Sequence, residues 1–128
     1  MITKWDDLFK IKIASSNLAM LKHEVVKEIL VIKLMNKYKK YRNMIRIYTE
    51  FELDNGLKPD VYFENVKTKE AIAFEIQKDY TAKWLNERTN SYRDYEVPFF
   101  NKFDWIPIDL NDFTDDINEM YEKLGEYV

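Results

Sequence analysis

Apolar residues recur at intervals of three and four positions from Asn17 to about Tyr41. The positions that follow this spacing are Leu18, Leu21, Val25, Ile29, Ile32 and Met35. The pattern predicts a long α-helix that buries one face. Ser15 and Ser16 precede it, and both are of the residue types that cap helix starts.

The pattern changes after the helix to one that favours strands. The segment from Met44 to Leu53 is rich in Ile, Tyr, Thr and Phe, and it ends at the turn residues Asp54-Asn55-Gly56. Two more strands are expected around Val61 and Ala71. In the second, side chains alternate, so that Glu75 and Gln77 share a small, polar face opposite the core-facing residues Ile72, Phe74 and Ile76.

The remaining chain predicts a helix, a strand and a helix. A helical composition runs from about Thr81 to Glu96, with Asp79 or Thr81 as the cap and Val97-Pro98 as the stop. Phe103–Leu110 reads as a strand, and Thr114 as the cap of a final helix from Asp115 to Tyr127. The expected order is helix, three strands, helix, strand, helix, an α/β (α+β) fold.

Length and composition favour one domain over residues 1–128. A chain of 128 residues can bury one substantial core, and two glycines and three prolines leave no evident linker. Met1–Ala14 is expected to be a separate helix or arm that packs on the core or on a partner through its apolar side chains. These are Trp5, Leu8, Phe9, Ile11 and Ile13.

Composition also excludes several kinds of site. There is no cysteine and one histidine, so disulfides, cysteine-ligated zinc and multi-histidine zinc sites are excluded, as is a Ser-His-Asp mechanism without His23. The longest apolar run contains Lys33 and is too short to span a bilayer. Asp6 and Asp7 interrupt the start, unlike in a secretory signal. The expectation is a cytoplasmic protein without a membrane partner.

Charge is unevenly distributed, although the net charge is −3 and the isoelectric point about 5.3. Basic residues gather at the end of the first helix, and others lie on the later helix. The first group is Lys33, Lys37, Lys39, Lys40, Arg42 and Arg46, and the second Lys83, Arg88 and Arg93. The first group reads equally as a solvated helix end or as a track for a phosphate backbone.

Two carboxylates on neighbouring strands are the leading candidate site. Asp60 opens one expected strand and Glu75 lies on the next. Hard cations such as Mg²⁺ or Mn²⁺ bind oxygen ligands and retain several waters, so these carboxylates and a backbone carbonyl suffice for a metal site. The alternatives are that Asp60 is a turn residue after a proline and that Glu75 is a solvated edge position.

These residues resemble the PD-(D/E)xK nuclease superfamily, whose motif is Pro-Asp at a strand start and Glu-x-Lys on the following strand. Here Pro59-Asp60 is followed, after fourteen residues, by Glu75-Ile76-Gln77. Glutamine replaces the usual lysine, as in Glu-x-Gln variants, and alternation turns Lys78 to the other face. The resemblance implies a restriction-endonuclease-like core: a helix, a three-stranded antiparallel meander, a crossover helix, a fourth strand and a C-terminal helix.

The resemblance also implies roles for particular residues. Holliday-junction resolvases of the superfamily place a metal-site glutamate on the first helix, which matches Glu24, with Glu28 one turn later left open. Asp60, Glu75, Glu24 and the Ile76 carbonyl would hold the metal, and Gln77 would complete the catalytic set. Short relatives carry a basic residue and a tyrosine one turn apart on the crossover helix, as in Arg88 and Tyr92. The residues expected to contact DNA are Lys39, Lys40, Arg42, Lys58, Lys78, Lys83, Arg88 and Tyr92.

The function implied is that of a Mg²⁺-dependent deoxyribonuclease, similar to resolvases that cut branched or junction DNA as homodimers. Either a lysine such as Lys58, Lys78 or Lys83 is expected to replace the charge missing at Gln77, or catalysis is expected to be slow. The first alternative is a catalytically inactive nuclease fold that binds DNA or protein. The second is an interaction module in which the long helix pairs with a partner and the carboxylates are incidental.

Overall fold

The computed structural model describes residues 17–128, so the predicted N-terminal arm and the caps Ser15 and Ser16 lie outside the described residues. Helix α2 spans Leu18–Lys37. It begins at Asn17, whose side-chain oxygen accepts a hydrogen bond from the Met20 N–H at 3.2 Å. A 3₁₀ helix, η1 (Lys39–Met44), follows it. The long helix is therefore confirmed, but it ends four residues before Tyr41.

The buried face of α2 differs from the predicted one. Its buried apolar residues are Leu21, Val25, Val26, Ile29, Leu30 and Leu34. Leu18, Ile32 and Met35, which were expected on this face, are about half exposed, at 54%, 50% and 46%. The predicted face was wrong at these positions because the stripe that packs on the sheet is centred on Val26 and Leu30, both fully buried.

Four strands form one mixed sheet in the order β1-β2-β3-β4. Their bounds are Ile45–Thr49 for β1, Val61–Asn65 for β2, Glu70–Gln77 for β3 and Lys102–Asp109 for β4. The first three are antiparallel neighbours, and β4 pairs parallel with β3. The predicted meander and fourth strand are confirmed. Strand β1 ends earlier than predicted because Glu50 takes a left-handed conformation, with φ of 54°.

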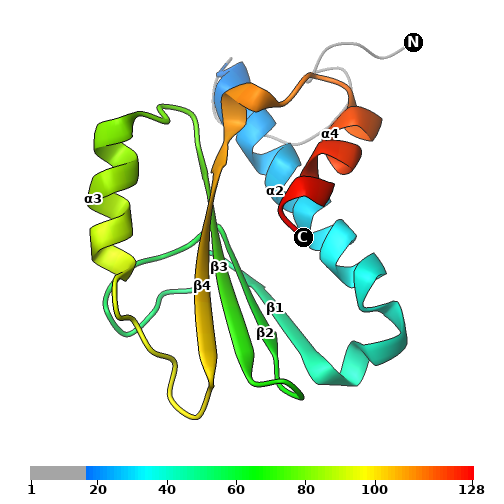
Figure 1. The fold of residues 1–128 in the computed structure, drawn as a ribbon. Coiled ribbons are helices and arrows are strands. Elements are labelled where there is room, and N and C mark those ends of the chain that lie inside the picture. Colours follow the sequence, from blue (N-terminus) through cyan, green and yellow to red (C-terminus); the bar gives the residue numbers. More distant parts are fainter. Residues whose placement is uncertain (1–16) are drawn as a thin grey trace.

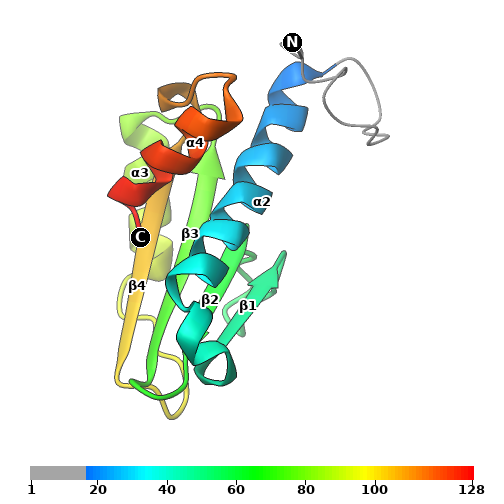
Figure 2. The same cartoon turned by 90° about the vertical axis from the view of Figure 1, so that its right-hand side faces the viewer.

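Helices cover both faces of the sheet (Figures 1 and 2). Helix α3 (Ala82–Tyr92) lies on one face, and α2 and α4 (Ile117–Lys123) lie on the other. Thr81 caps α3, as one of the two predicted caps. Asp116, and not Thr114, caps α4, because its carboxylate accepts the Glu119 N–H at 3.0 Å while the Thr114 hydroxyl bonds the Glu119 side chain.

The two faces carry separate apolar clusters. Val61, Phe63, Phe74 and Ile76 pack under α2 and α4, as strand alternation predicts. On the α3 side, a second cluster contains Leu53, Tyr62, Ala71, Ala73 and Tyr92. The face of β3 that carries Glu75 was expected to be polar, which was wrong in part, because α3 and its aromatic residues cover it. Glu75 therefore sits at the border of a buried aromatic cluster.

The fold is mixed α/β, completed by two short 3₁₀ helices, η2 (Leu110–Asp112) and η3 (Leu124–Glu126). Across residues 17–128, no helix is both long and apolar enough to cross a membrane. The end of the sheet where β3 terminates lies beside the start of α2 (Figure 1). The candidate site is found at this end.

Candidate functional site

The sheet brings Asp60 and Glu75 together. Val61 and Phe74 form the last pair between β2 and β3, and Asp60 directly precedes Val61 while Glu75 directly follows Phe74. The Asp60 carboxylate (Oδ2) accepts the backbone N–H of Ile76 at 2.7 Å. This bond fixes the carboxylate beside the backbone that also carries the Ile76 carbonyl.

His23 on α2 lies against the same atoms. Its Nε2 is 3.0 Å from the Ile76 carbonyl oxygen and 3.3 Å from Asp60 Oδ2. Both partners are acceptors, so we assign the Nε2 proton to His23 as the donor. The hydrogen bond with Asp60 raises the pKa of His23 above its usual 6.5, with further support from the negative charges of Asp60 and Glu24 and against the effect of burial. His23 is thus held between two oxygens proposed as metal ligands.

Glu24 joins this group, and Glu28 does not. The Glu24 carboxylate lies 3.5 Å from His23 Nδ1 and 2.7 Å from the Lys27 ammonium. Glu28 is exposed, one turn further along α2. The choice that the sequence left open therefore falls on Glu24 as the glutamate that lies at the site.

Lys27 is a buried cation beside these residues. Its side chain is only 8% exposed, and its ammonium contacts Glu24 at 2.7 Å and Glu50 at 3.1 Å. Burial lowers the pKa of Lys27, but the hydrogen bonds and charges of the two glutamates outweigh this effect and raise it overall. Glu50 is the residue after β1 whose backbone adopts the left-handed conformation. A connected polar network therefore runs from Asp60 through His23 and Glu24 to Lys27 and Glu50.

Sequence reasoning assigned no role at the site to Lys27 or His23. A signal for both was present in α2. Positions 23, 27, 30 and 34 recur at helical spacing, and Leu30 and Leu34 are fully buried. Once the buried stripe is centred correctly, His23 and Lys27 fall on the face that packs on the sheet.

Glu75 meets a different environment on the α3 side of the sheet. Its Oε2 lies 3.6 Å from Arg88 Nε, and its side chain is 13% exposed. Burial raises the pKa of Glu75, while Tyr92, Arg88 and Trp105 oppose the rise and Asp60 adds to it. Glu75 Oε2, the Tyr92 hydroxyl and the Trp105 indole nitrogen are all buried with no hydrogen-bond partner. Tyr92 and Trp105 thus lie near enough to favour the carboxylate, but outside hydrogen-bond geometry.

The residues predicted to contact DNA lie in different environments. Tyr92 is 5% exposed and stacks on Phe103 and Trp105, so its ring belongs to the apolar cluster. Arg88 is paired with Glu75. The lysines Lys58, Lys78 and Lys83 are exposed, and Lys78 lines a pocket with His23 and Glu24.

The other predicted contacts, Lys39, Lys40 and Arg42, are exposed but lie at the opposite end of the molecule. They follow the end of α2, and Lys37 in its last turn is about 21 Å along the helix axis from His23. A phosphate track that joins them to the carboxylates must therefore cross most of the length of α2.

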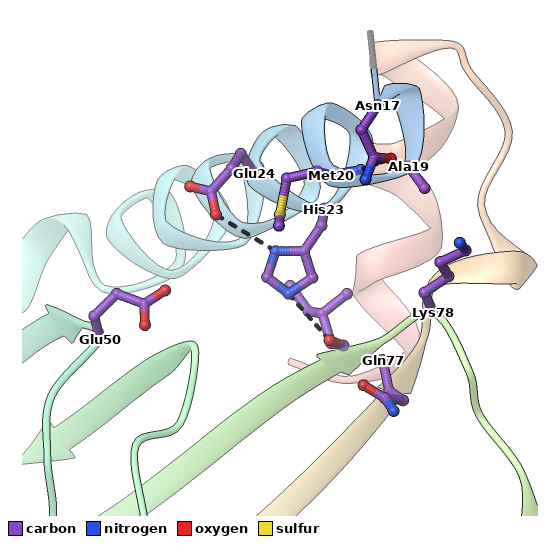
Figure 3. Close-up of a pocket in the computed structure, with 9 residues that line it drawn as sticks. Asn17, Ala19, Met20, His23, Glu24, Glu50, Gln77 and Lys78 are labelled. Carbon is purple, nitrogen blue, oxygen red and sulfur yellow. Dashed lines mark hydrogen bonds and ion pairs between the residues drawn. The ribbon is translucent and has the colours of Figure 1, made fainter. Parts of the chain in front are cut away.

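Gln77 is neutral, so it brings no charge to the site. Its amide nitrogen donates to the Asp79 carbonyl at 3.4 Å, and Figure 3 shows the side chain on the far side of the strand from His23. The pocket beside it has a volume of about 490 Å³ and is also lined by Asn17, Met20 and Glu50. The pocket is therefore open to a ligand at the end of β3.

Carboxylate and carbonyl oxygens are ligands that hard cations prefer, but few of them lie at the site. Across residues 17–128, no group of three or more His, Cys, Asp or Glu side chains is placed to hold a metal ion. The available ligands are Asp60, Glu75 and the Ile76 carbonyl, which need water to complete a shell. The unpartnered, buried Glu75 Oε2 is the atom that such an ion would satisfy.

Comparisons with known proteins give no relative for this chain. No family model matches it, and no curated protein or solved structure matches it either.

Proposed function

We propose that this protein is a metal-dependent deoxyribonuclease of the PD-(D/E)xK type. The observation that carries the proposal is that Asp60, directly before β2, accepts the backbone N–H of Ile76, the residue that follows Glu75 on β3, at 2.7 Å. Two carboxylates and a carbonyl at the end of neighbouring strands form a set of hard oxygen ligands. Such a set is suited to divalent-ion chemistry on a phosphodiester.

The architecture supports this proposal. The chain runs from a helix through an antiparallel meander to a crossover helix and a parallel fourth strand. This is the order that the resemblance implies for a restriction-endonuclease-like core. Glu24 also lies on the first helix and reaches the site, which is the position that the resemblance implies for a further metal-site glutamate.

Asp60, Glu75 and the Ile76 carbonyl would hold Mg²⁺ or Mn²⁺, with Glu24 contributing directly or through water. When bound, the ion would lower the pKa of a water molecule and neutralise charge on the scissile phosphate. His23 contacts both Asp60 and the Ile76 carbonyl through Nε2. His23 must therefore lose the Nε2 proton or move away before Asp60 and the Ile76 carbonyl oxygen can bind a metal ion.

The residues of the chain orient this chemistry. The Ile76 N–H fixes Asp60 through its 2.7 Å hydrogen bond. Burial among Tyr92 and Trp105 gives Glu75 a low-dielectric setting, in which its attraction to a cation is stronger than in water. Exposed Lys78 and Lys83 lie at the same end of the sheet and are available to phosphates.

The substrate and assembly follow from the resemblance. A resolvase-like enzyme would cut branched or junction DNA as a homodimer, because two symmetric cuts require two sites. The preference for junctions rests on analogy with the superfamily, since a fold does not determine its substrate.

A catalytically silent nuclease fold that binds DNA or protein is the second candidate. Gln77 lacks the usual positive charge, and its amide is turned to the Asp79 carbonyl. His23 also fills the space between Asp60 and the Ile76 carbonyl. Both observations favour a protein that keeps the fold without cleavage.

The test is cleavage of labelled duplex, single-stranded and four-way-junction DNA with Mg²⁺, Mn²⁺ or EDTA. Asp60→Asn and Glu75→Gln preserve shape and remove charge, and Glu28→Gln is the matched control on an exposed position of α2. Metal-dependent cutting that both site variants lose and Glu28→Gln retains would support the nuclease. DNA binding without cutting would favour the silent fold, and the absence of both would favour an interaction module.

A further inference from the structure

The site lacks the motif cation at position 77, and the exposed lysines do not replace it. Gln77 is neutral and bonds the Asp79 carbonyl. Lys58, Lys78 and Lys83 are exposed, and across residues 17–128 none of them forms an ion pair with a site carboxylate. The expectation that one of these lysines supplies the charge therefore gains no support from their placement.

Two basic side chains other than His23 do contact carboxylates at the site. Lys27 is held by Glu24 at 2.7 Å and Glu50 at 3.1 Å, with 8% of its side chain exposed. To reach a substrate it would have to break two short ion pairs. Lys27 is therefore fixed as a support for Glu24.

Arg88 is held much more loosely. Its Nε lies 3.6 Å from Glu75 Oε2, and one third of the side chain is exposed. Within the described part of the chain, this ion pair is the one polar contact of the Arg88 side chain. Arg88 can leave Glu75 by a change of side-chain rotamer, without breaking a hydrogen bond.

The position of Arg88 relative to the strand is the second observation. Glu75 and Gln77 share a face of β3 by strand alternation, and α3 covers that face. The guanidinium therefore approaches from the side on which a longer residue at position 77 would stand. A guanidinium also presents donors that match two phosphate oxygens.

We propose that Arg88 is a catalytic residue that contacts the scissile phosphate and supplies the positive charge missing at Gln77. This inference rests on the proposed nuclease function and goes beyond it by assigning the charge to α3. Arg88 neutralises Glu75 while the site is empty of cations. When a cation other than Arg88 neutralises Glu75, the Arg88 guanidinium loses its ion-pair partner. It then turns to the negatively charged phosphate.

The first test measures cleavage. Arg88→Ala should lower kcat about 10²–10³-fold, the size seen when one donor to a developing charge is removed. Mn²⁺ affinity should not fall, because Arg88 is not a ligand and its loss removes a cation that competes for Glu75. The double variant Arg88→Ala/Gln77→Lys should regain at least about tenfold in kcat, because lysine restores the charge from the strand. Arg93→Ala, an exposed position just after α3, is the matched control.

The second test needs no cleavage. In the Glu75→Gln background Arg88 has no carboxylate partner, so it is free to bind a backbone phosphate. With EDTA present, adding Arg88→Ala to Glu75→Gln should reduce the slope of log affinity for DNA against log salt by about one. Adding Arg93→Ala should leave the slope as it is in Glu75→Gln alone.

Three results would each overturn the assignment: Arg88→Ala that keeps kcat within about threefold of wild type, a loss that Gln77→Lys does not recover, or an unchanged salt slope. Failure of the nuclease proposal looks different. In that case wild type itself shows no metal-dependent cutting beyond that of Asp60→Asn, and the Arg88 assignment falls with it.

Discussion

The two sides of the sheet treat their carboxylates differently. On the α2 side, Asp60 accepts the Ile76 N–H and contacts His23, and Lys27 bridges two further glutamates. On the α3 side, Glu75 Oε2 is buried with only a 3.6 Å contact to Arg88. Two neighbouring donors, the Tyr92 hydroxyl and the Trp105 indole N–H, are buried without partners as well.

We infer from this difference that the α2 side supports the structure of the site, whereas the α3 side keeps groups available for a ligand. Buried polar groups are nearly always hydrogen-bonded, and each unsatisfied one costs about 1–3 kcal/mol. On the α2 side His23 Nδ1 also lacks a hydrogen-bond partner, at 3.5 Å from Glu24, but Asp60 and Lys27 are paired, so their contacts stabilise the fold and fix Asp60. The α3 side bears the cost around Glu75, which is typical of a site that keeps groups available for a ligand. The candidate site thus combines a carboxylate that is fixed, Asp60, with one that is unsatisfied, Glu75.

The largest expected effect comes from removing the fixed carboxylate, Asp60. Asp60→Ala should lower the free energy of unfolding by about 2–3 kcal/mol, because the buried Ile76 N–H loses a charged acceptor and His23 loses its partner. Urea denaturation followed by circular dichroism measures this. Asp60→Asn keeps an acceptor oxygen and should lose less than half as much.

Equal losses in the two Asp60 variants would contradict the role of the Ile76 bond. The result also decides how nuclease assays are read, since a loss of cleavage in Asp60→Ala mixes unfolding with chemistry. Asp60→Asn separates them.

The second effect tests whether Lys27 supports the same α2 side. Lys27→Met should cost about 1–2 kcal/mol, because Glu24 and Glu50 lose their shared cation while both remain partly solvated. Thermal or urea unfolding measures it against Glu28→Gln, a surface change expected within about 0.5 kcal/mol of wild type. A Lys27→Met protein as stable as Glu28→Gln would show that the network adds nothing to the fold.

The sequence predicted the two carboxylates of the site but not the residues that contact them. The order of elements, and Asp60 and Glu75 as neighbours, were predictable, because strand alternation and turn residues are local signals. The partners of these carboxylates were not. His23 reaches Ile76 across 53 positions of the chain, and Arg88 reaches Glu75 only because α3 packs on that face. Such contacts depend on how helices pack on the sheet, which residue spacing does not determine.

The unsatisfied carboxylate is tested by Glu75→Gln. Because burial raises the pKa of Glu75, the charged form is disfavoured in the folded state. Wild type therefore loses stability as the pH rises from the usual value of 4.5 through the folded-state pKa, while Glu75→Gln does not. At pH 7 we expect Glu75→Gln to be more stable than wild type by about 1 kcal/mol.

Unfolding by urea at pH 4 and at pH 7 measures the difference. The two proteins should converge at pH 4, where Glu75 is protonated in both the folded and the unfolded state. A Glu75→Gln variant that is less stable than wild type at pH 7 would indicate that Arg88 outweighs burial and that Glu75 is satisfied.

The smallest expected effect concerns His23, the only histidine in the chain and hence a clean spectroscopic reporter. NMR titration of its ring should give a pKa above 6.5, mainly because of the hydrogen bond with Asp60, and Asp60→Asn should lower that pKa. A raised folded-state pKa means that the contribution to stability is fully present below pH 6.5 and is lost as the pH rises through the folded-state value. We expect this contribution to stay below about 1 kcal/mol, because His23 is only partly buried. A pKa at or below 6.5 would show that burial outweighs the Asp60 contact, and the α2 side would then be no better paired than the α3 side.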